Sequence, residues 1–158
     1  AMAVAALKAN GLTNHARTRE AVRLLEDRML PTGGCNYGNT EVLGQTLRPH
    51  LQPSGLCLWA LAGESKSRRT HLTLDYVRRA TERAQTPWSF AWGAIGLAAW
   101  NDAQQPKEKY RAIADSALRQ KSPMSLALAI LALQGAQSLP VKAIRKEVGH
   151  APEVSKHV

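Results

Sequence analysis

The residues best suited to bind a ligand lie in one long connection, residues 30–52, which shows no helical or strand periodicity. Connections of this length inside compact domains are usually functional or mobile. This one offers a phenol, a carboxylate, a guanidinium and an imidazole, from Tyr37, Glu41, Arg48 and His50. It leads into an apolar segment that we expect to be a helix, whose first N–H groups favour anions. One interpretation is a lid or wall over a binding site, with Arg48 and the helix start as an anion site.

The same connection also fits a structural role. Gly33, Gly34 and Asn36 are typical of a tight turn, after which the chain could pack as a strap across neighbouring helices. Metal binding is a third interpretation, because the segment and the helix after it contain carboxylate, imidazole and thiol groups. Their spacing matches no closed zinc pattern and no fourth ligand is evident, so we expect no metal and no other cofactor.

Two cysteines and a group of aromatic residues carry the remaining chemistry. Cys57 lies in an uncharged segment and fits a small buried residue, and its pairing with Cys35 in a disulfide stays open. The aromatic residues of the uncharged segments are Trp59, Trp88, Phe90, Trp92 and Trp100. Such rings can line a pocket for an isoprenoid-like or other apolar ligand. The alternative is core packing, since Trp88 and Trp92 are one helical turn apart.

The composition indicates which elements position these groups. The chain has 158 residues, enough for one domain with its own core. It contains 25 Ala and 20 Leu against 8 Val and 4 Ile, which favours an all-α protein. Hydrophobic residues make up 44%, which excludes disorder of the whole chain. We find no apolar run long enough to span a membrane and no signal-peptide pattern, and neither the compartment nor the oligomeric state follows from these residues.

Three similar helix starts indicate a repeated architecture. Pro53, Pro87 and Pro123 are 34 and 36 residues apart, and each opens an uncharged stretch. Amphipathic helices are expected between these stretches, over residues 13–29, 70–84 and 106–120. A period near 35 residues is typical of helical repeats. We therefore predict two layers, with uncharged helices on a concave inner wall and amphipathic helices outside, over a repeat domain at 1–139. Residues 140–158 are expected to form a short helix and a frayed tail.

The net charge of +9 indicates either an anionic partner or a basic surface that is exposed to solvent. Most of the basic residues fall on the predicted outer helices, so a solvated outer face explains them. The doublets Arg68-Arg69 and Arg78-Arg79 keep nucleic acid open as an alternative. No aromatic residues interleave with them, so nucleic acid is not the expected partner.

One segment carries a resemblance to a known family. Residues 19–39, REAVRLLEDRMLPTGGCNYGN, resemble the QW repeat of squalene and oxidosqualene cyclases, in which an amphipathic helix, Gln, a Gly-containing turn and Trp follow in order. The resemblance implies the α/α toroid that these cyclases share with protein prenyltransferase β-subunits. Arg28 and Cys35 stand where the repeat has Gln and Trp. About three and a half hairpins are expected, so the resemblance implies a partial barrel or arc, the C-terminal part of a larger toroid.

The family's catalytic motifs are missing from this sequence. The four aspartates, Asp27, Asp75, Asp102 and Asp115, are isolated and form no Asp-x-Asp-Asp acid motif. The prenyltransferase zinc ligands are also missing, as is the Cys-Gly-Glu-Gln motif of the complement thioester domains, which share the toroid. We therefore predict a non-catalytic prenyltransferase-like or cyclase-like domain that binds an apolar, isoprenoid-like ligand or a protein partner on its concave face. The predicted binding residues are Tyr37, Glu41, Arg48, His50, Trp59, Trp88, Phe90 and Trp92.

Two alternatives remain open. The chain could be the C-terminal portion of an isoprenoid cyclase or prenyltransferase whose catalytic acid lies outside it. It could also be a basic α-solenoid that binds protein or nucleic acid, and a homo-oligomer is compatible with each interpretation.

Overall fold

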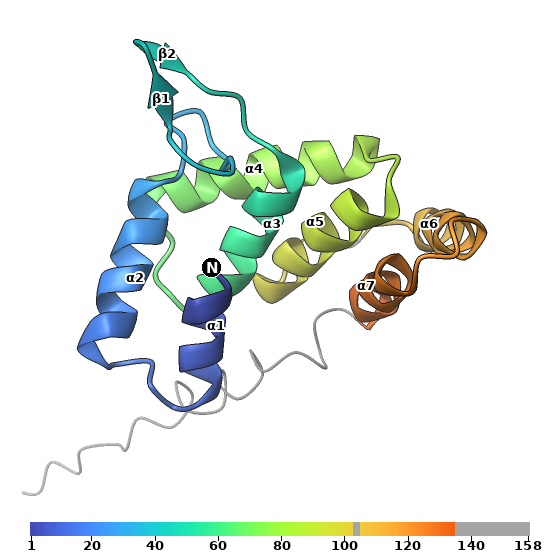
Figure 1. Cartoon of the computed structure of the whole chain (residues 1–158), viewed down its shortest axis with the longest axis horizontal. Helices are drawn as coiled ribbons and strands as arrows, with labels where there is room; N and C mark the ends of the chain where they lie inside the picture. The colour runs from blue at the N-terminus through green and yellow to red at the C-terminus, as the bar shows by residue number, and fades with distance from the viewer. Residues whose placement is uncertain (103–104, 135–158) are drawn as a thin grey trace, which may run out of the picture.

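The computed structural model describes residues 1–102 and 105–134, and helices form most of this part of the chain (Figure 1). The helices are α1 (Met2–Ala9), α2 (Ala16–Asp27), α3 (Leu51–Ala60), α4 (Arg68–Arg83), α5 (Pro87–Ala99), α6 (Lys107–Arg119) and α7 (Pro123–Leu133). A two-stranded antiparallel hairpin, β1 (Glu41–Val42) and β2 (Gln45–Thr46), lies between α2 and α3. The predicted all-α class is confirmed. Residues 135–139 of the predicted repeat domain and the predicted tail at 140–158 lie outside the described residues.

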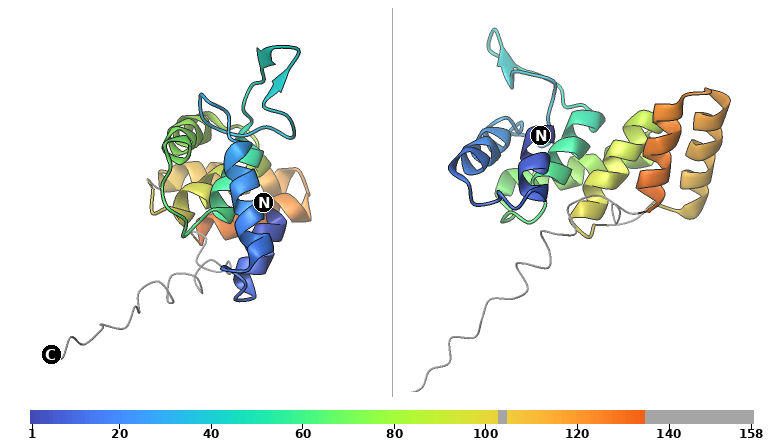
Figure 2. Two further views of the ribbon diagram at one scale, coloured as in Figure 1. Left: turned by 90° about the vertical axis from the view of Figure 1, so that its left-hand side faces the viewer. Right: turned by 60° about the horizontal axis from the view of Figure 1, so that its bottom comes forward.

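The helices alternate between two kinds. α1, α3, α5 and α7 form a row in which each helix packs against the next, and α3, α5 and α7 carry no charged residue. The amphipathic α4 packs against both α3 and α5, and α6 packs against both α5 and α7 (Figure 2). Each uncharged helix is thereby covered on more than one side, as its composition requires. Closure of the row into a toroid stays a prediction. None of the described helices is long and apolar enough to cross a membrane.

Local sequence signals start the helices. Thr86 and Ser122 cap α5 and α7 by accepting hydrogen bonds from the backbone N–H groups of Ser89 and Ser125. Proline occupies the first turn of both helices, as predicted. α3 begins two residues earlier than expected, at Leu51, so that its proline lies in the first turn, where an N–H has no helical partner.

Glycines set the crossing of α3 and α5. A Cβ atom on Gly55 would lie 2.2 Å from the carbonyl oxygen of Trp92, and one on Gly96 would lie 2.6 Å from the carbonyl oxygen of Gly55. A Cβ on Gly93 would lie 2.2 Å from Oγ1 of Thr81 on α4. The two helices therefore meet backbone to backbone, and α4 packs closely over the crossing.

The connection before α3 divides into two parts. Gly33 and Gly34 have positive φ, and the N–H of Gly34 donates to Oγ1 of Thr73 on α4 at 3.0 Å. This part forms a tight turn that packs against α4, which agrees with the strap interpretation. The hairpin that follows projects away from the helices (Figures 1 and 2). Its turn residues, Leu43 and Gly44, both have positive φ, and Leu43 is 98% exposed.

Candidate ligand-binding surface

The core between the layers shows which side of α3 and α5 points away from α4. Leu58 of α3 and Leu97 of α5 are buried in one cluster with Leu74 and Val77 of α4. At 100° per residue, Leu56 lies about 160° around α3 from Leu58. Its side chain is therefore on the side of α3 that points away from α4.

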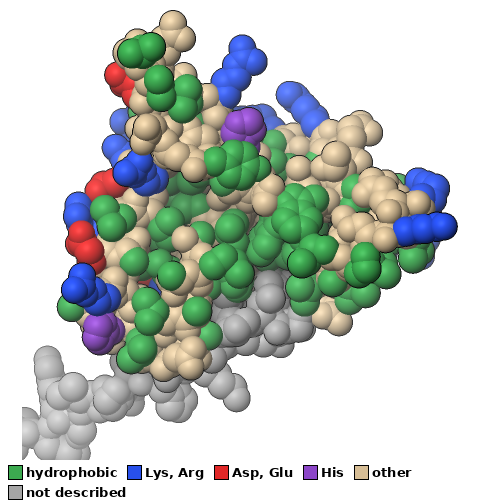
Figure 3. All heavy atoms as spheres, viewed as in Figure 1, with side chains coloured by type: hydrophobic (Ala, Val, Ile, Leu, Met, Phe, Trp, Pro, Cys, Tyr) green, Lys and Arg blue, Asp and Glu red, His purple; other side chains and the backbone are tan. Residues whose placement is uncertain are grey.

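The same geometry applies to α5. Trp88 and Trp92 lie about 180° and 140° around this helix from Leu97. Both are partly buried and pack against the core cluster that contains Trp59. We call the surface formed by Leu56, Trp59, Trp88 and Trp92 the inner face. Figure 3 shows hydrophobic side chains gathered in the middle of the molecule, over the region where α3 and α5 lie in Figure 1.

Two tryptophans form the centre of the inner face. The ring centroids of Trp59 and Trp92 are 6.1 Å apart with their planes tilted by 52°. Trp59 is only 6% exposed. The indole N–H groups of both residues are buried and have no hydrogen-bond partner among the described residues. By contrast, the indole N–H of Trp100 donates to the carbonyl oxygen of Leu58 at 2.7 Å.

Unpartnered buried N–H groups are costly. Each is expected to destabilise the folded chain by about 1–3 kcal/mol relative to a satisfied group. Native proteins pair nearly all such groups, so each exception calls for a physical explanation. The N–H groups of Trp59 and Trp92 lie beneath an apolar surface, so a bound molecule that brings a hydrogen-bond acceptor satisfies them only if the two rings shift.

Phe90, which the sequence also predicts as a binding residue, lies in the interior of the protein. It is fully buried and its ring packs edge-on against Tyr110 of α6, with centroids 5.1 Å apart. Burial raises the pKa of Tyr110 above its ordinary value, with an opposing hydrogen bond to the backbone of Gln105. Phe90 has no exposed surface for a ligand in this structure, because it lies two residues before Trp92 and so points to a different side of α5.

The structure brings two of the loop residues together and leaves two apart. The ring centroids of Tyr37 and His50 are 5.3 Å apart, and the Tyr37 hydroxyl donates to Oε1 of Gln52 at 2.9 Å. Glu41 is in the projecting hairpin, and both it and Arg48 are exposed. The predicted anion site at Arg48 and the start of α3 stays a prediction.

The sequence interpretation missed two residues of this region, Gln52 and Leu56. They lie one turn apart on α3, so the Tyr37–Gln52 hydrogen bond is one helical turn from the inner face. Their spacing could have indicated them, because Leu56 lies three residues before Trp59 and Gln52 lies four residues before Leu56, so all three share one side of a helix. Among residues 1–102 and 105–134, no three His, Cys, Asp or Glu side chains are placed to hold a metal ion.

A buried lysine forms a second polar cluster. Lys8 is 3% exposed and its ammonium group contacts the carbonyl oxygens of Ala60 and Ala62 and Oε1 of Glu64, at 3.0, 3.2 and 2.7 Å. Burial raises the pKa of Glu64, but hydrogen bonds from Lys8 and Arg19 outweigh it and hold that pKa below its ordinary value. All three ammonium donors are used inside the protein, so this cluster closes the end of α3.

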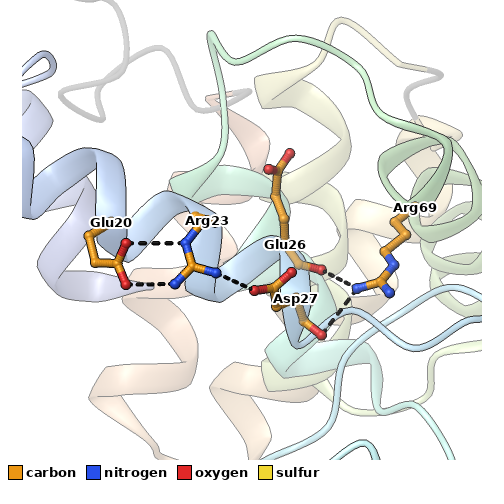
Figure 4. Close-up of polar contacts among 5 residues, drawn as sticks. All are labelled: Glu20, Arg23, Glu26, Asp27 and Arg69. Atoms are coloured by element: carbon orange, nitrogen blue, oxygen red, sulfur yellow. Dashed lines mark hydrogen bonds and ion pairs between the residues drawn. The ribbon is translucent and has the colours of Figure 1, made fainter.

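Charged side chains of the outer helices α2 and α4 pair with other groups of the protein. Figure 4 shows Arg23 between Glu20 and Asp27, with nitrogen–oxygen distances of 2.7 and 3.0 Å. It also shows Arg69 of α4 donating to the carbonyl oxygens of Glu26 and Asp27, at 3.1 and 3.2 Å. Arg69 thereby satisfies the last carbonyls of α2. Arg69 thus joins α4 to α2, whereas the contacts of Arg23 lie within α2.

Comparison with known proteins identifies no family to which this chain belongs. No protein-family model matches the chain, and no curated protein or solved structure matches it. The resemblance to the squalene cyclase and prenyltransferase repeats therefore stays a prediction, based on residues 19–39.

Proposed function

We propose that this chain is a binding module whose inner face takes an apolar, isoprenoid-like molecule that carries one hydrogen-bond acceptor. The observation behind this proposal is the pair of buried indole N–H groups, on Trp59 and Trp92, without partners among the described residues. Leu56, Trp88 and the tryptophan rings supply the apolar contact, and the N–H groups supply orientation. The ligand needs no charge, because the uncharged helices place no ionised side chain on the inner face.

The four aspartates, all in the described part of the chain, do not supply an acid on the inner face. Asp75 and Asp102 both pair with the guanidinium of Arg78, at 2.7 and 2.8 Å, and Asp27 pairs with an arginine of its own helix. The hydrogen bonds that Arg78 donates to Asp102 and Asp75 raise the pKa of its guanidinium, which remains charged. The fourth aspartate, Asp115, is exposed on α6. The binding function is therefore preferred to the isoprenoid cyclase or transferase alternative.

A ligand titration tests the proposal. The probes are farnesol and the hydrocarbon farnesene, which share a 15-carbon skeleton but differ in the hydroxyl group. Quenching of tryptophan fluorescence reports binding, with an expected Kd for farnesol of roughly 0.1–0.5 mM from about 0.3 kcal/mol per heavy atom. Farnesol should bind about 5- to 10-fold more tightly than farnesene, because one neutral hydrogen bond contributes about 1 kcal/mol.

A conservative variant identifies the donor. Trp92→Phe keeps an aromatic ring and removes one of the two N–H groups, so the preference for farnesol over farnesene should fall below that of the unmodified protein, with only the N–H of Trp59 left to donate. Trp100→Phe is the matched control, since that indole N–H already has an internal acceptor, and it should keep the preference. Far-UV circular dichroism checks that both variants fold. Absence of binding in the unmodified protein, or equal affinity for the alcohol and the hydrocarbon, would overturn the proposal.

A further inference from the structure

The two cysteines meet in the interior of the protein. Cys35 follows the glycine turn, whereas Cys57 lies in the middle of α3. The structure has both as free thiols, 6% and 3% exposed, in one core cluster. The two thiols, whose pairing the sequence left open, therefore pack in the same buried cluster of the folded chain.

Backbone contacts hold Cys35 over α3. Its N–H donates to Oγ of Ser54 at 2.8 Å, and its carbonyl oxygen accepts from the N–H of His50 at 2.8 Å. Ser54 is fully buried and lies three residues before Cys57, on the same side of the helix. The contacts that anchor Cys35 therefore also direct its side chain to Cys57.

Glycine makes this approach possible. A Cβ atom on Gly34 would lie 2.6 Å from Cβ of Pro49 and 2.8 Å from Cδ1 of Tyr76, and Gly34 has a φ of +82°. A larger residue before Cys35 would push the turn away from α3 and α4. The thiol contact is therefore built into the backbone path of the turn.

We infer that Cys35 and Cys57 form an intramolecular disulfide site that is oxidised in the folded protein by a small-molecule disulfide. In the reaction, the thiolate of Cys57 attacks a sulfur of glutathione disulfide and releases one glutathione thiolate. The Cys35 thiolate then attacks the mixed disulfide at the Cys57 sulfur and releases the second glutathione. One sulfur–sulfur bond forms in the protein, one breaks in the oxidant, and two electrons pass to glutathione.

The acid–base properties of the pair agree with this order. The hydrogen bond from Cys35 lowers the pKa of Cys57, although burial opposes the effect. The same interaction, together with burial, raises the pKa of Cys35. Cys57 is therefore the thiol that ionises first and begins the exchange. Because both sulfurs are buried, the exchange requires local opening of the glycine turn and is slower than at an exposed thiol.

The bond would fix the base of the projecting loop. It closes the chain over residues 35–57, a segment that includes the hairpin, Tyr37 and His50. Cross-linking a loop of this size restricts the unfolded chain and raises the Tm by roughly 5–10 °C. This inference is independent of the proposed ligand function, since the disulfide lies outside the inner face and its formation needs no ligand.

The test uses the full chain as purified. One sample is incubated with glutathione disulfide and another with dithiothreitol, and both are denatured and alkylated with N-ethylmaleimide before mass spectrometry. The oxidised sample should carry no label, show a mass loss of about 2 Da and contain a Cys35–Cys57 cross-linked peptide. Its Tm should exceed that of the reduced sample, and dithiothreitol should reverse both changes.

Variants separate a native pair from nonspecific oxidation. Cys35→Ala and Cys57→Ala should each remove the cross-link and the redox dependence of the Tm, while the remaining thiol is alkylated or carries glutathione. Two labelled thiols in the oxidised wild-type chain, cross-links only between chains, or a disulfide that lowers the Tm would each overturn the inference. The wild-type comparison remains decisive even if one variant does not fold.

Discussion

The crossing of α3 and α5 gives the sharpest prediction for stability. In Gly55→Ala the new Cβ would lie 2.2 Å from the carbonyl oxygen of Trp92 and 2.9 Å from the backbone nitrogen of Gly93. Backbone atoms in the middle of a helix cannot move away independently. The two helices must therefore separate by about 1.2 Å to reach a tolerable 3.4 Å contact with that oxygen.

The cost follows from the contacts that this separation opens. A buried side chain makes about 40–60 contacts of about 0.1–0.2 kcal/mol, and a gap of about 1 Å removes up to half of each. Loosening the packing around Trp59 and Trp92 then costs roughly 3–4 kcal/mol. Alanine restores about 1 kcal/mol through its better helix propensity. The free energy of unfolding should therefore fall by about 2–3 kcal/mol, and the Tm by roughly 5–10 °C.

Urea unfolding followed by circular dichroism at 222 nm measures this change. Gly38→Ala is the matched control, because Gly38 is exposed, does not have a positive φ, and a Cβ atom added to it would meet nothing within 4 Å. It should change the free energy of unfolding by less than about 0.5 kcal/mol. A Gly55→Ala protein as stable as the wild type would refute the backbone-to-backbone packing of α3 and α5.

Two further predictions concern the charged contacts. Lys8→Met should lower the free energy of unfolding by about 3 kcal/mol, since it leaves Glu64 and two carbonyl oxygens without a buried cation. Because the folded-state pKa of Glu64 is lowered, its contribution is complete above the ordinary carboxyl pKa and is lost as the pH falls through the folded value. Urea titrations between about pH 3 and 7 should therefore show a smaller loss of stability toward acid in Lys8→Met than in the wild type. Arg69→Ala should cost about 1 kcal/mol by exposing the end of α2, whereas the exposed neighbour Arg68→Ala should be nearly neutral, and thermal unfolding of the two variants tests the difference.

The sequence was most informative about local structure. Proline and a preceding Thr or Ser start α5 and α7 where the spacing predicts them, because these preferences depend only on the first turn of a helix. The amphipathic spacing likewise predicts α2, α4 and α6 to within a few residues at each end. The hairpin at 41–46 was not predicted, because four exposed residues in two short strands give no periodic signal.

The candidate site was only partly predictable. Phe90 and Trp92 are equivalent by type and lie in the same uncharged helix, yet one is fully buried against Tyr110 and the other belongs to the inner face. An uncharged helix has no polar side to indicate its orientation, so its sequence cannot distinguish inward from outward positions. The N–H groups of Trp59 and Trp92, which have no partner among the described residues, can be identified only from the positions of the packed helices.

By itself, then, the sequence determined an all-α chain with alternating uncharged and amphipathic helices, since composition, caps and periodicity act within a few residues. Tertiary structure alone decided the glycine crossing of Gly55 and Gly96, the contact between Cys35 and Cys57, and which tryptophans share the inner face. These features depend on distances between segments far apart in the chain. Such distances are set by the packing of the whole set of helices, and no local pattern encodes them.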